Sequence, residues 1–208
     1  GQLVLMVSTH VDDLKGCGED KHVSALIQFL ESKYGKLVTH YPPFEHCGVM
    51  HTVDDKSGGI VMSQDHYILQ LRPIPDAGVS AMKPDEPVGQ ELISAFMCLW
   101  GGVAWRAQPR ADILCFVGHL QRHAKAPNAS HLLELNKLLK YLKRTKASVR
   151  YTKPSANMVL ACISDSAFQT REPDCLALRG GIIALLEADQ GRHVPGGACH
   201  VLEFYSRK

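Results

Sequence analysis

A cluster of helix-breaking residues near the middle of the chain sets the strongest limit on how it can fold. Between residues 71 and 87 lie Pro73, Pro75, Gly78, Pro84 and Pro87. Proline lacks the backbone N–H and disfavours the helical conformation of the residue before it, so neither a helix nor a central strand can run through this stretch. We therefore expect a linker here, with different kinds of structure on its two sides.

The residues before the linker predict two hairpins and one helix. Residues 1–11 are apolar and β-branched and run into Asp12 and Asp13, with two glycines close behind, so we expect a tight hairpin with both aspartates at or near its tip. Apolar residues then recur at helical spacing over residues 23–34, which indicates an amphipathic helix packed on a sheet. Two further apolar runs flank the polar residues 54–59 and predict the second hairpin.

The residues after the linker predict helices first and strands later. Helical periodicity covers residues 90–104, 111–124 and 130–146, and short strand patterns cover 149–152, 158–163, 181–186 and 201–205. The whole chain of 208 residues is long enough for one or two compact units. These patterns predict an α+β fold.

Composition excludes several classes of protein. With 45% apolar and 21% charged residues, the chain is neither disordered nor collagen-like. The longest uncharged run, residues 92–105, is shorter than the roughly 20 residues that span a bilayer, so we expect no membrane association. Seven scattered cysteines without a Cys-x-x-Cys pair favour a reduced, intracellular setting, and we expect no zinc site. No His-Glu-x-x-His or comparable ligand spacing is expected among the eleven histidines.

A basic stretch stands out within a nearly neutral chain, whose net charge is only +2. The segment from His119 to Arg150 contains one acidic residue, Glu134, and eight basic residues, which are Arg122, Lys125, Lys137, Lys140, Lys143, Arg144, Lys146 and Arg150. Lysines follow one side of the last predicted helix and leucines the other. A polyanion is the natural partner of such a basic face.

The adjacent carboxylates of Asp12 and Asp13 are the residues most typical of a reaction site. No lysine or arginine lies beside them before Lys15. Two like charges repel, so the pair favours a divalent cation, and Mg²⁺ held by carboxylates and substrate phosphates is common in phosphoryl transfer. Val-Asp-Asp occurs again at residues 53–55, where Lys-Ser-Gly-Gly follows, and we interpret that copy as an ordinary polar turn.

Six short segments occur in an order that one protein family shares. They are His10-Val11-Asp12-Asp13, His46-Cys47-Gly48-Val49, Ser63-Gln64-Asp65-His66-Tyr67-Ile68, Arg110-Ala111-Asp112-Ile113, Pro127 with His131 and the run Leu139 to Thr145, and Ser164-Asp165-Ser166-Ala167-Phe168. The family has Tyr-Val-Asp-Asp, Phe-Leu-Gly-Ile, Ser-Gln-x-x-Tyr-Ile, Arg-Pro-Asp-Ile, Pro-x-x-x-His with Leu-Arg-Tyr-Leu-Lys-Gly-Thr, and Ser-Asp-Ala-Asp-Trp. On these segments the chain resembles the C-terminal part of the reverse transcriptase of copia-type LTR retrotransposon Pol polyproteins, running into the start of their ribonuclease H domain.

The resemblance implies three parts and one parent reaction. Residues 1–72 would be the C-terminal part of the palm with antiparallel hairpins, residues 73–147 the helical thumb and connection, and residues 148–208 an incomplete ribonuclease H-like sheet. The implied reaction is RNA-directed DNA synthesis, a two-metal nucleotidyl transfer in which a primer 3′-hydroxyl attacks the α-phosphate of a deoxynucleoside triphosphate. The implied partners are an RNA template with its DNA primer and the remainder of the Pol polyprotein, in cytoplasmic particles or the nucleus.

The resemblance also assigns roles to single residues. Asp12, Asp13 and Asp165 would be catalytic carboxylates that hold Mg²⁺, with Asp12 the main ligand of the first pair and Asp165 the first ribonuclease H carboxylate. Cys47, Gly48 and Val49 would lie in the strand that presses on the primer backbone. Lys137, Lys140, Lys143, Arg144 and Lys146 would hold the template and primer duplex by its phosphates.

The chain also departs from the family pattern. His10 and His46 replace an aromatic and an apolar residue, Ala167 and Phe168 replace Asp and Trp, and Ala177-Leu178-Arg179-Gly180 is a poor match to Arg-Ser-Thr-Ser-Gly. The family also uses an aspartate upstream of the hairpin and a ribonuclease H glutamate downstream, which these 208 residues do not contain. We therefore expect a fragment without a complete site for either reaction.

Three alternatives follow from the same residues. The first is a retrotransposon-derived module that has lost catalysis and binds nucleic acid through the basic stretch. The second is a decayed relic without a selected role, which His10 and His46 favour. The third is an unrelated Mg²⁺-dependent hydrolase that uses Asp12 and Asp13.

Overall fold

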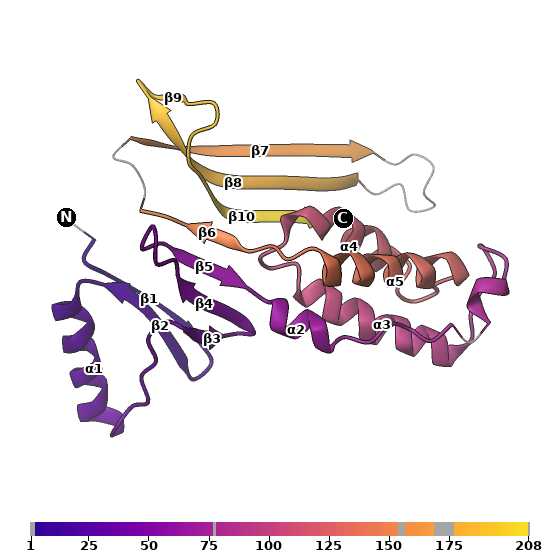
Figure 1. The fold of residues 1–208 in the computed structure, drawn as a ribbon, viewed down its shortest axis with the longest axis horizontal. Coiled ribbons are helices and arrows are strands. Elements are labelled where there is room, and N and C mark those ends of the chain that lie inside the picture. The colour runs from indigo at the N-terminus through magenta and orange to yellow at the C-terminus, as the bar shows by residue number, and fades with distance from the viewer. Residues whose placement is uncertain (1–2, 77, 154–156, 169–176, 208) are drawn as a thin grey trace.

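The structure, a computed structural model, describes residues 3–76, 78–153, 157–168 and 177–207. Over these residues it contains five α-helices and three antiparallel sheets, which confirms the predicted α+β class (Figure 1). No helix in the described part of the chain is long and apolar enough to cross a membrane.

The N-terminal region (residues 3–46) begins with the predicted hairpin and helix. Strands β1 (Leu5–His10) and β2 (Asp13–Gly18) form a two-stranded sheet, and α1 (Asp20–Tyr34) lies beside it and ends at Gly35. Gly35 has a φ of 84°, which glycine adopts without steric cost, and its backbone N–H donates to the Glu31 carbonyl at the end of the helix. The apolar stripe of α1 is only half-buried, because a single hairpin cannot cover it.

A second sheet joins segments from both sides of the helices. Its order is β3 (Phe44–His46), β4 (Val49–Val53), β5 (Ile60–Ser63) and β6 (Val149–Tyr151). The hairpin of β4 and β5 confirms the second predicted hairpin. Strand β6 follows the last helix in the chain and pairs with β5, so the chain returns to this sheet after the helical part.

The helical unit (residues 65–144) contains α2 (Asp65–Gln70), a 3₁₀ turn η1 (Val79–Ala81), α3 (Gln90–Trp105), a 3₁₀ turn η2 (Ala111–Ile113), α4 (Leu114–Arg122) and α5 (Ala129–Arg144). The three predicted helices are confirmed, although the second begins with the 3₁₀ turn. The linker is irregular as expected, but Ile74 and Val79 within it are buried. It is therefore packed against the helices.

The hydrophobic core lies within the helical unit. Every member of the core cluster falls between residues 68 and 142, and α5 contributes Leu132, Leu135, Leu138, Leu139 and Leu142. These leucines recur at three- and four-residue spacing, so one face of α5 is apolar over its whole length. The helical unit is therefore the best-packed part of the described chain.

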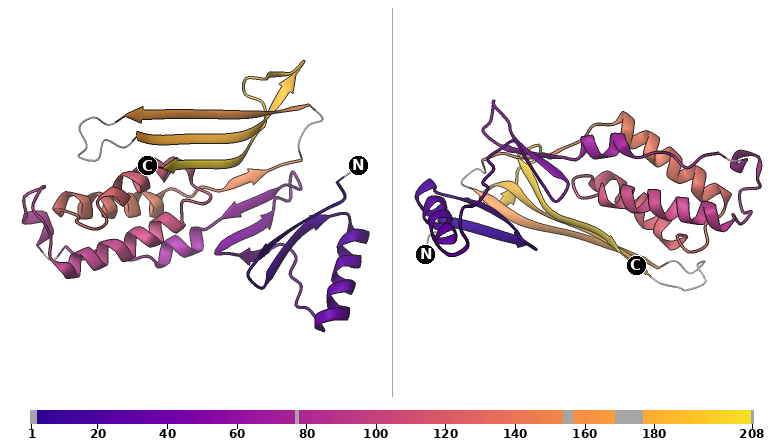
Figure 2. Two further views of the ribbon diagram at one scale, coloured as in Figure 1. Left: turned by 180° about the vertical axis from the view of Figure 1, so that it is seen from behind. Right: turned by 90° about the horizontal axis from the view of Figure 1, so that it is seen from below.

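The third sheet follows β6. Strands β7 (Met158–Phe168), β8 (Ala177–Asp189) and β10 (Cys199–Arg207) lie in the order β10-β8-β7, and the short β9 (Arg192–His193) pairs with β8. The strands are longer than predicted, because their pairing continues through polar residues. Strand β10 lies beside α4, and the left view of Figure 2 shows this sheet above the helices. The Tyr151 hydroxyl of β6 donates to the Val201 carbonyl of β10 at 2.6 Å.

Candidate metal and nucleic-acid site

The first hairpin presents Asp12 and Asp13 at its tip, as predicted. His10 pairs with Asp13 at the end of the ladder, so Val11 and Asp12 form a two-residue turn. Val11 has a φ of 55° and is 94% exposed. A positive φ is a steric outlier for a β-branched residue, and such strain is concentrated at functional sites.

The two carboxylates lie at the edge of a cavity. An open pocket of about 300 Å³ is lined by the hairpin, the apolar stripe of α1, residues 37–41 and strand β3, and its lining includes Asp12, Asp13 and Lys15. Within the described part of the chain neither aspartate has an ion pair or a side-chain hydrogen bond. Uncompensated carboxylate oxygens are the donors that Mg²⁺ prefers, so these residues fit the expected metal.

The hairpin tip lies close to the segment predicted to contact the primer. The ring centroids of His10 and His46 are 6.3 Å apart, and those of His46 and His51 are 6.5 Å apart. His46 also lines the cavity beside the carboxylates. Two of the six matching segments, distant in sequence, therefore meet around one cavity.

A polar contact holds this arrangement. The Lys15 ammonium donates to Nε2 of the buried His51 at 3.0 Å, and Nδ1 of the same ring donates to the Val49 carbonyl at 2.9 Å. Burial lowers the pKa of His51, and the charge of Lys15 lowers it further. The neutral ring is therefore the form whose Nε2 accepts the hydrogen bond from Lys15. Neither residue was singled out from the sequence, because no local pattern signals a contact between β2 and β4.

The predicted primer-contacting segment is a turn and not a continuous strand, so that part of the prediction was wrong. Strand β3 ends at His46, Cys47 and Gly48 have φ values of 50° and 72°, and β4 begins at Val49. A Cβ atom at Gly48 would lie 2.8 Å from Nε1 of Trp105, which ends α3. The absent side chain therefore allows this turn to contact the helical unit.

Asp165 lies apart from the other two carboxylates. The prediction placed it at the end of a strand over residues 158–163, but β7 continues to Phe168, and Asp165 pairs with Gly180 of β8. The strand continues because β8 supplies partners along its whole length. The Asp165 side chain is exposed, and its Oδ1 accepts the Ser166 N–H at 2.8 Å. The structure does not bring another of the predicted metal ligands to it.

The predicted nucleic-acid contacts lie on the exposed side of α5 and just beyond it. Lys137, Lys140, Lys143, Arg144 and Lys146 are all exposed. Lys143 donates to the Leu71 carbonyl at 2.6 Å, and Arg150 pairs with Asp54 at 3.0 Å. The ammonium groups of Lys137 and Lys140 and the guanidinium of Arg144 have no ion pair among the described residues. This stripe can therefore contact phosphates.

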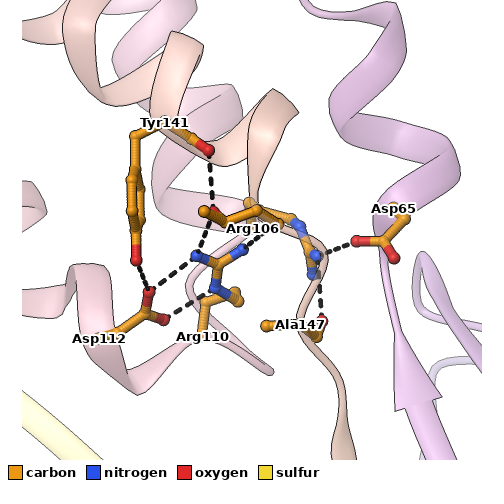
Figure 3. A network of polar contacts seen from close by, with 7 residues as sticks. Asp65, Arg106, Arg110, Asp112, Tyr141 and Ala147 are labelled. Carbon is orange, nitrogen blue, oxygen red and sulfur yellow. Dashed lines mark hydrogen bonds and ion pairs between the residues drawn. The ribbon is translucent and has the colours of Figure 1, made fainter.

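Two buried arginines hold the end of α5 (Figure 3). Arg110 donates to both carboxylate oxygens of Asp112 at 2.8 and 2.7 Å and to the Thr145 carbonyl at 2.7 Å. The Tyr141 hydroxyl donates to Asp112 at 2.9 Å, and hydrogen bonds from Arg110 lower the pKa of Asp112. Arg106 donates to Asp65 at 2.6 Å. These contacts fasten α5, η2 and α2 together.

Comparisons with protein-family models, curated proteins and solved structures found no match.

Proposed function

We propose that the chain is part of the reverse transcriptase of a copia-type LTR retrotransposon Pol polyprotein, with the start of its ribonuclease H domain. In this proposal Asp12 and Asp13 are the palm carboxylates, and the β3–β4 turn contacts the primer. The observation that carries the proposal is the meeting of the hairpin tip with His46 at one cavity. A nucleotidyl-transfer site needs metal-binding carboxylates beside the groups that hold the primer end.

The chain's own residues would supply binding and orientation. Asp12 and Asp13 would hold Mg²⁺, which when bound supplies Lewis-acid polarisation of a phosphate and lowers the pKa of a coordinated hydroxyl. Lys15 and His51 fix the position of β2 relative to β4, and hence of the carboxylates relative to the β3–β4 turn. The exposed stripe of α5 would bind duplex phosphates.

A second observation supports the resemblance independently. Arg110, Asp112, Tyr141 and Thr145 belong to two of the matching segments, and all four side chains meet in one hydrogen-bonded network (Figure 3). Matches that arose separately by chance would have no reason to contact one another. If the helical unit has the fold of the family, one hydrogen-bonded network explains why both segments carry these residue types.

Exposed apolar side chains on the first hairpin also support the palm assignment. Met6, Val7 and Leu14 are exposed although they lie on paired strands. A two-stranded sheet is marginal by itself, and apolar residues on it favour burial by further strands or helices. Upstream palm elements of the parent polymerase would supply that cover.

Primer extension by the complete reverse transcriptase that contains this chain tests the proposal. Asp12→Asn should abolish extension and change duplex binding by less than about twofold, because the substitution removes one charge from an exposed tip. Asp55→Asn is the matched control, since Asp55 lies in the second Val-Asp-Asp sequence within an exposed turn. Extension retained by Asp12→Asn, or equal loss in both variants, would contradict the proposal. Loss of extension and duplex binding together would assign Asp12 a folding role.

One alternative function has its own supporting observation. Lys137, Lys140 and Arg144 form an exposed basic stripe that does not involve the hairpin, so the chain could bind nucleic acid without catalysis. Binding of an RNA–DNA hybrid by the 208-residue chain should then weaken linearly on a plot of log affinity against log salt concentration. Lys140→Glu with Arg144→Glu should flatten that slope, whereas Lys33→Glu on α1 should not. A salt-independent affinity would exclude this alternative.

A further inference from the structure

Three histidines gather at the corner where α4 turns into α5. His119, His123 and His131 each place a ring nitrogen within 4.8 Å of a ring nitrogen of the other two. His119 and His123 are half-buried, and His131 is buried. The ring centroids of His123 and His131 are 3.8 Å apart, and that of His119 is 5.2 and 6.2 Å from them. It is the one such group of potential metal ligands in the part of the chain that the structure describes.

The local fold explains why these residues converge. His119 and His123 are one helical turn apart at the end of α4, so their side chains lie on the same face. The chain then reverses over residues 124–128, and His131 lies in the first turn of α5. The prediction that no ligand spacing occurs among the histidines was wrong, because it overlooked His-x-x-x-His at residues 119 and 123. The third histidine comes from the next helix and could not be assigned from the sequence.

We propose that His119, His123 and His131 bind Zn²⁺, with the carboxylate of Glu134 as the fourth ligand. Imidazole nitrogen is a preferred zinc donor, and structural zinc sites are four-coordinate. Oε2 of Glu134 already lies 3.5 Å from Nε2 of His119. This site would fix the angle between α4 and α5 and is independent of the proposed polymerase function.

Zinc binding needs a ring rotation as well as a closer approach, because the rings of His123 and His131 are stacked with an interplanar angle of 17° and a metal must lie in the plane of each ligating ring. Tetrahedral zinc with bonds of 2.0–2.1 Å places its nitrogens about 3.4 Å apart, so nitrogens that lie within 4.8 Å of one another must approach by up to about 1.4 Å. His119 and His123 are half-buried at the helix corner and have room for such rotations, so these two rings would move toward the buried ring of His131.

Two existing contacts compete with the metal and provide a test. The Arg122 guanidinium donates to Nδ1 of His119 at 3.1 Å, and the Asn128 N–H donates to Nδ1 of His131 at 3.1 Å. If His119 and His131 bind zinc through Nε2, the proton of each neutral ring moves to Nδ1, which can then no longer accept hydrogen bonds from Arg122 and the Asn128 N–H. The Asn128 side chain still accepts the His131 N–H, so α5 keeps its N-cap. Removal of the Arg122 charge should therefore tighten zinc binding.

Titration of the reduced, metal-free 208-residue chain with Co²⁺, followed by displacement with Zn²⁺, tests the proposal. We expect one equivalent of Co²⁺ with the intense visible absorption of a tetrahedral site and no sulfur-to-cobalt charge-transfer band. His119→Asn and His123→Asn should each weaken binding at least about tenfold. His193→Asn, at an exposed position of β9, should leave the affinity unchanged. Arg122→Gln should strengthen binding.

Three outcomes would overturn the proposal. They are an octahedral cobalt spectrum, a charge-transfer band that places the metal on cysteine, and equal affinities in the wild-type chain and the two histidine variants. Circular dichroism should show unchanged helix content in each variant. If a histidine variant fails to fold, the Arg122→Gln result decides, because weaker or unchanged binding in that variant contradicts the proposed competition.

Discussion

The helical unit and the N-terminal region are built in opposite ways. The core cluster of the protein lies between residues 68 and 142, and Phe96, Leu135 and Val103 there are completely buried. In the N-terminal region, residues 3–46, no residue is buried, and Met6, Phe29 and Tyr34 are exposed. The helices can enclose side chains between them, whereas one hairpin and one helix cannot.

This difference separates stability from the proposed chemistry. The carboxylates proposed for catalysis lie in the region with the least packing, and the contact between Lys15 and His51 ties that region to the second sheet. The residues that fasten the helical unit, such as Arg110, are remote from the hairpin tip in the chain and belong to a different network. Substitutions in the two regions should therefore differ in the size and kind of their effects.

The largest expected difference concerns leucine truncation. Leu135→Ala on α5 should lower the free energy of unfolding by about 3 kcal/mol, because it leaves a cavity in a fully buried site. Leu26→Ala on α1 should lower it by less than about 1 kcal/mol, because that side chain is half-exposed. Urea unfolding followed by circular dichroism measures both. Equal losses would mean that the two regions unfold as one equally packed body.

A second comparison sets a buried arginine against an exposed one. Arg110→Met should destabilise the protein by about 2 kcal/mol, because the Thr145 carbonyl loses its Arg110 donor and Asp112 keeps only the Tyr141 hydroxyl. Arg150→Met removes the ion pair with Asp54 on the sheet surface and should change the stability by less than about 1 kcal/mol. Thermal unfolding at two salt concentrations measures the pair. A larger loss for Arg150→Met would contradict the central role of the network.

Most of the fold could be predicted because its elements carry local patterns. Leucines at helical spacing gave α5, and alternating apolar runs around a polar turn gave β4 and β5. The pairing of β6 with β5 could not be predicted, because it joins segments separated by the whole helical unit. The burial of Ile74 in the proline-rich linker was missed for the same reason, since the surface that covers it is formed by distant helices.

The candidate site, too, could be predicted only in part from the sequence. The position of Asp12 and Asp13 at a hairpin tip followed from an apolar strand and two nearby glycines. The approach of His10 to His46, and the hydrogen bond from Lys15 to His51, depend on how two sheets are placed in space. A sequence pattern describes one element at a time, so contacts between elements without a shared motif remain out of its reach.

A change of pH should sharpen the contrast by loosening the N-terminal region. Burial and Lys15 lower the folded pKa of His51 below its ordinary value of 6.5. The stability from the neutral ring is therefore present above pH 6.5 and is lost as the pH falls through the lowered folded pKa, where two cations would meet. We expect the hairpin to lose about 1 kcal/mol of protection against amide exchange, corrected for intrinsic rates.

His51→Gln is the control for this pH effect. The amide oxygen of glutamine can accept a hydrogen bond from Lys15 but does not titrate. Protection of the hairpin against amide exchange should therefore become independent of pH below 6.5. Amide exchange of β1 and β2 measured by NMR at several pH values distinguishes the two proteins. A pH dependence that persists in His51→Gln would assign the effect to another group.

The smallest expected effect concerns Val11, whose positive φ is strained. Val11→Gly should raise hairpin protection by about 0.5–1 kcal/mol, because glycine adopts this conformation without the Cβ clash. Amide exchange of β1 at neutral pH measures it, and lower protection would mean that the turn does not demand this backbone conformation. If the strained turn also orients Asp12 for the proposed reaction, the same variant should slow primer extension by the complete enzyme while its hairpin becomes more stable. If Val11→Gly makes the hairpin more stable and leaves primer extension unchanged, the positive φ of Val11 has no catalytic role and follows only from the geometry of a two-residue turn.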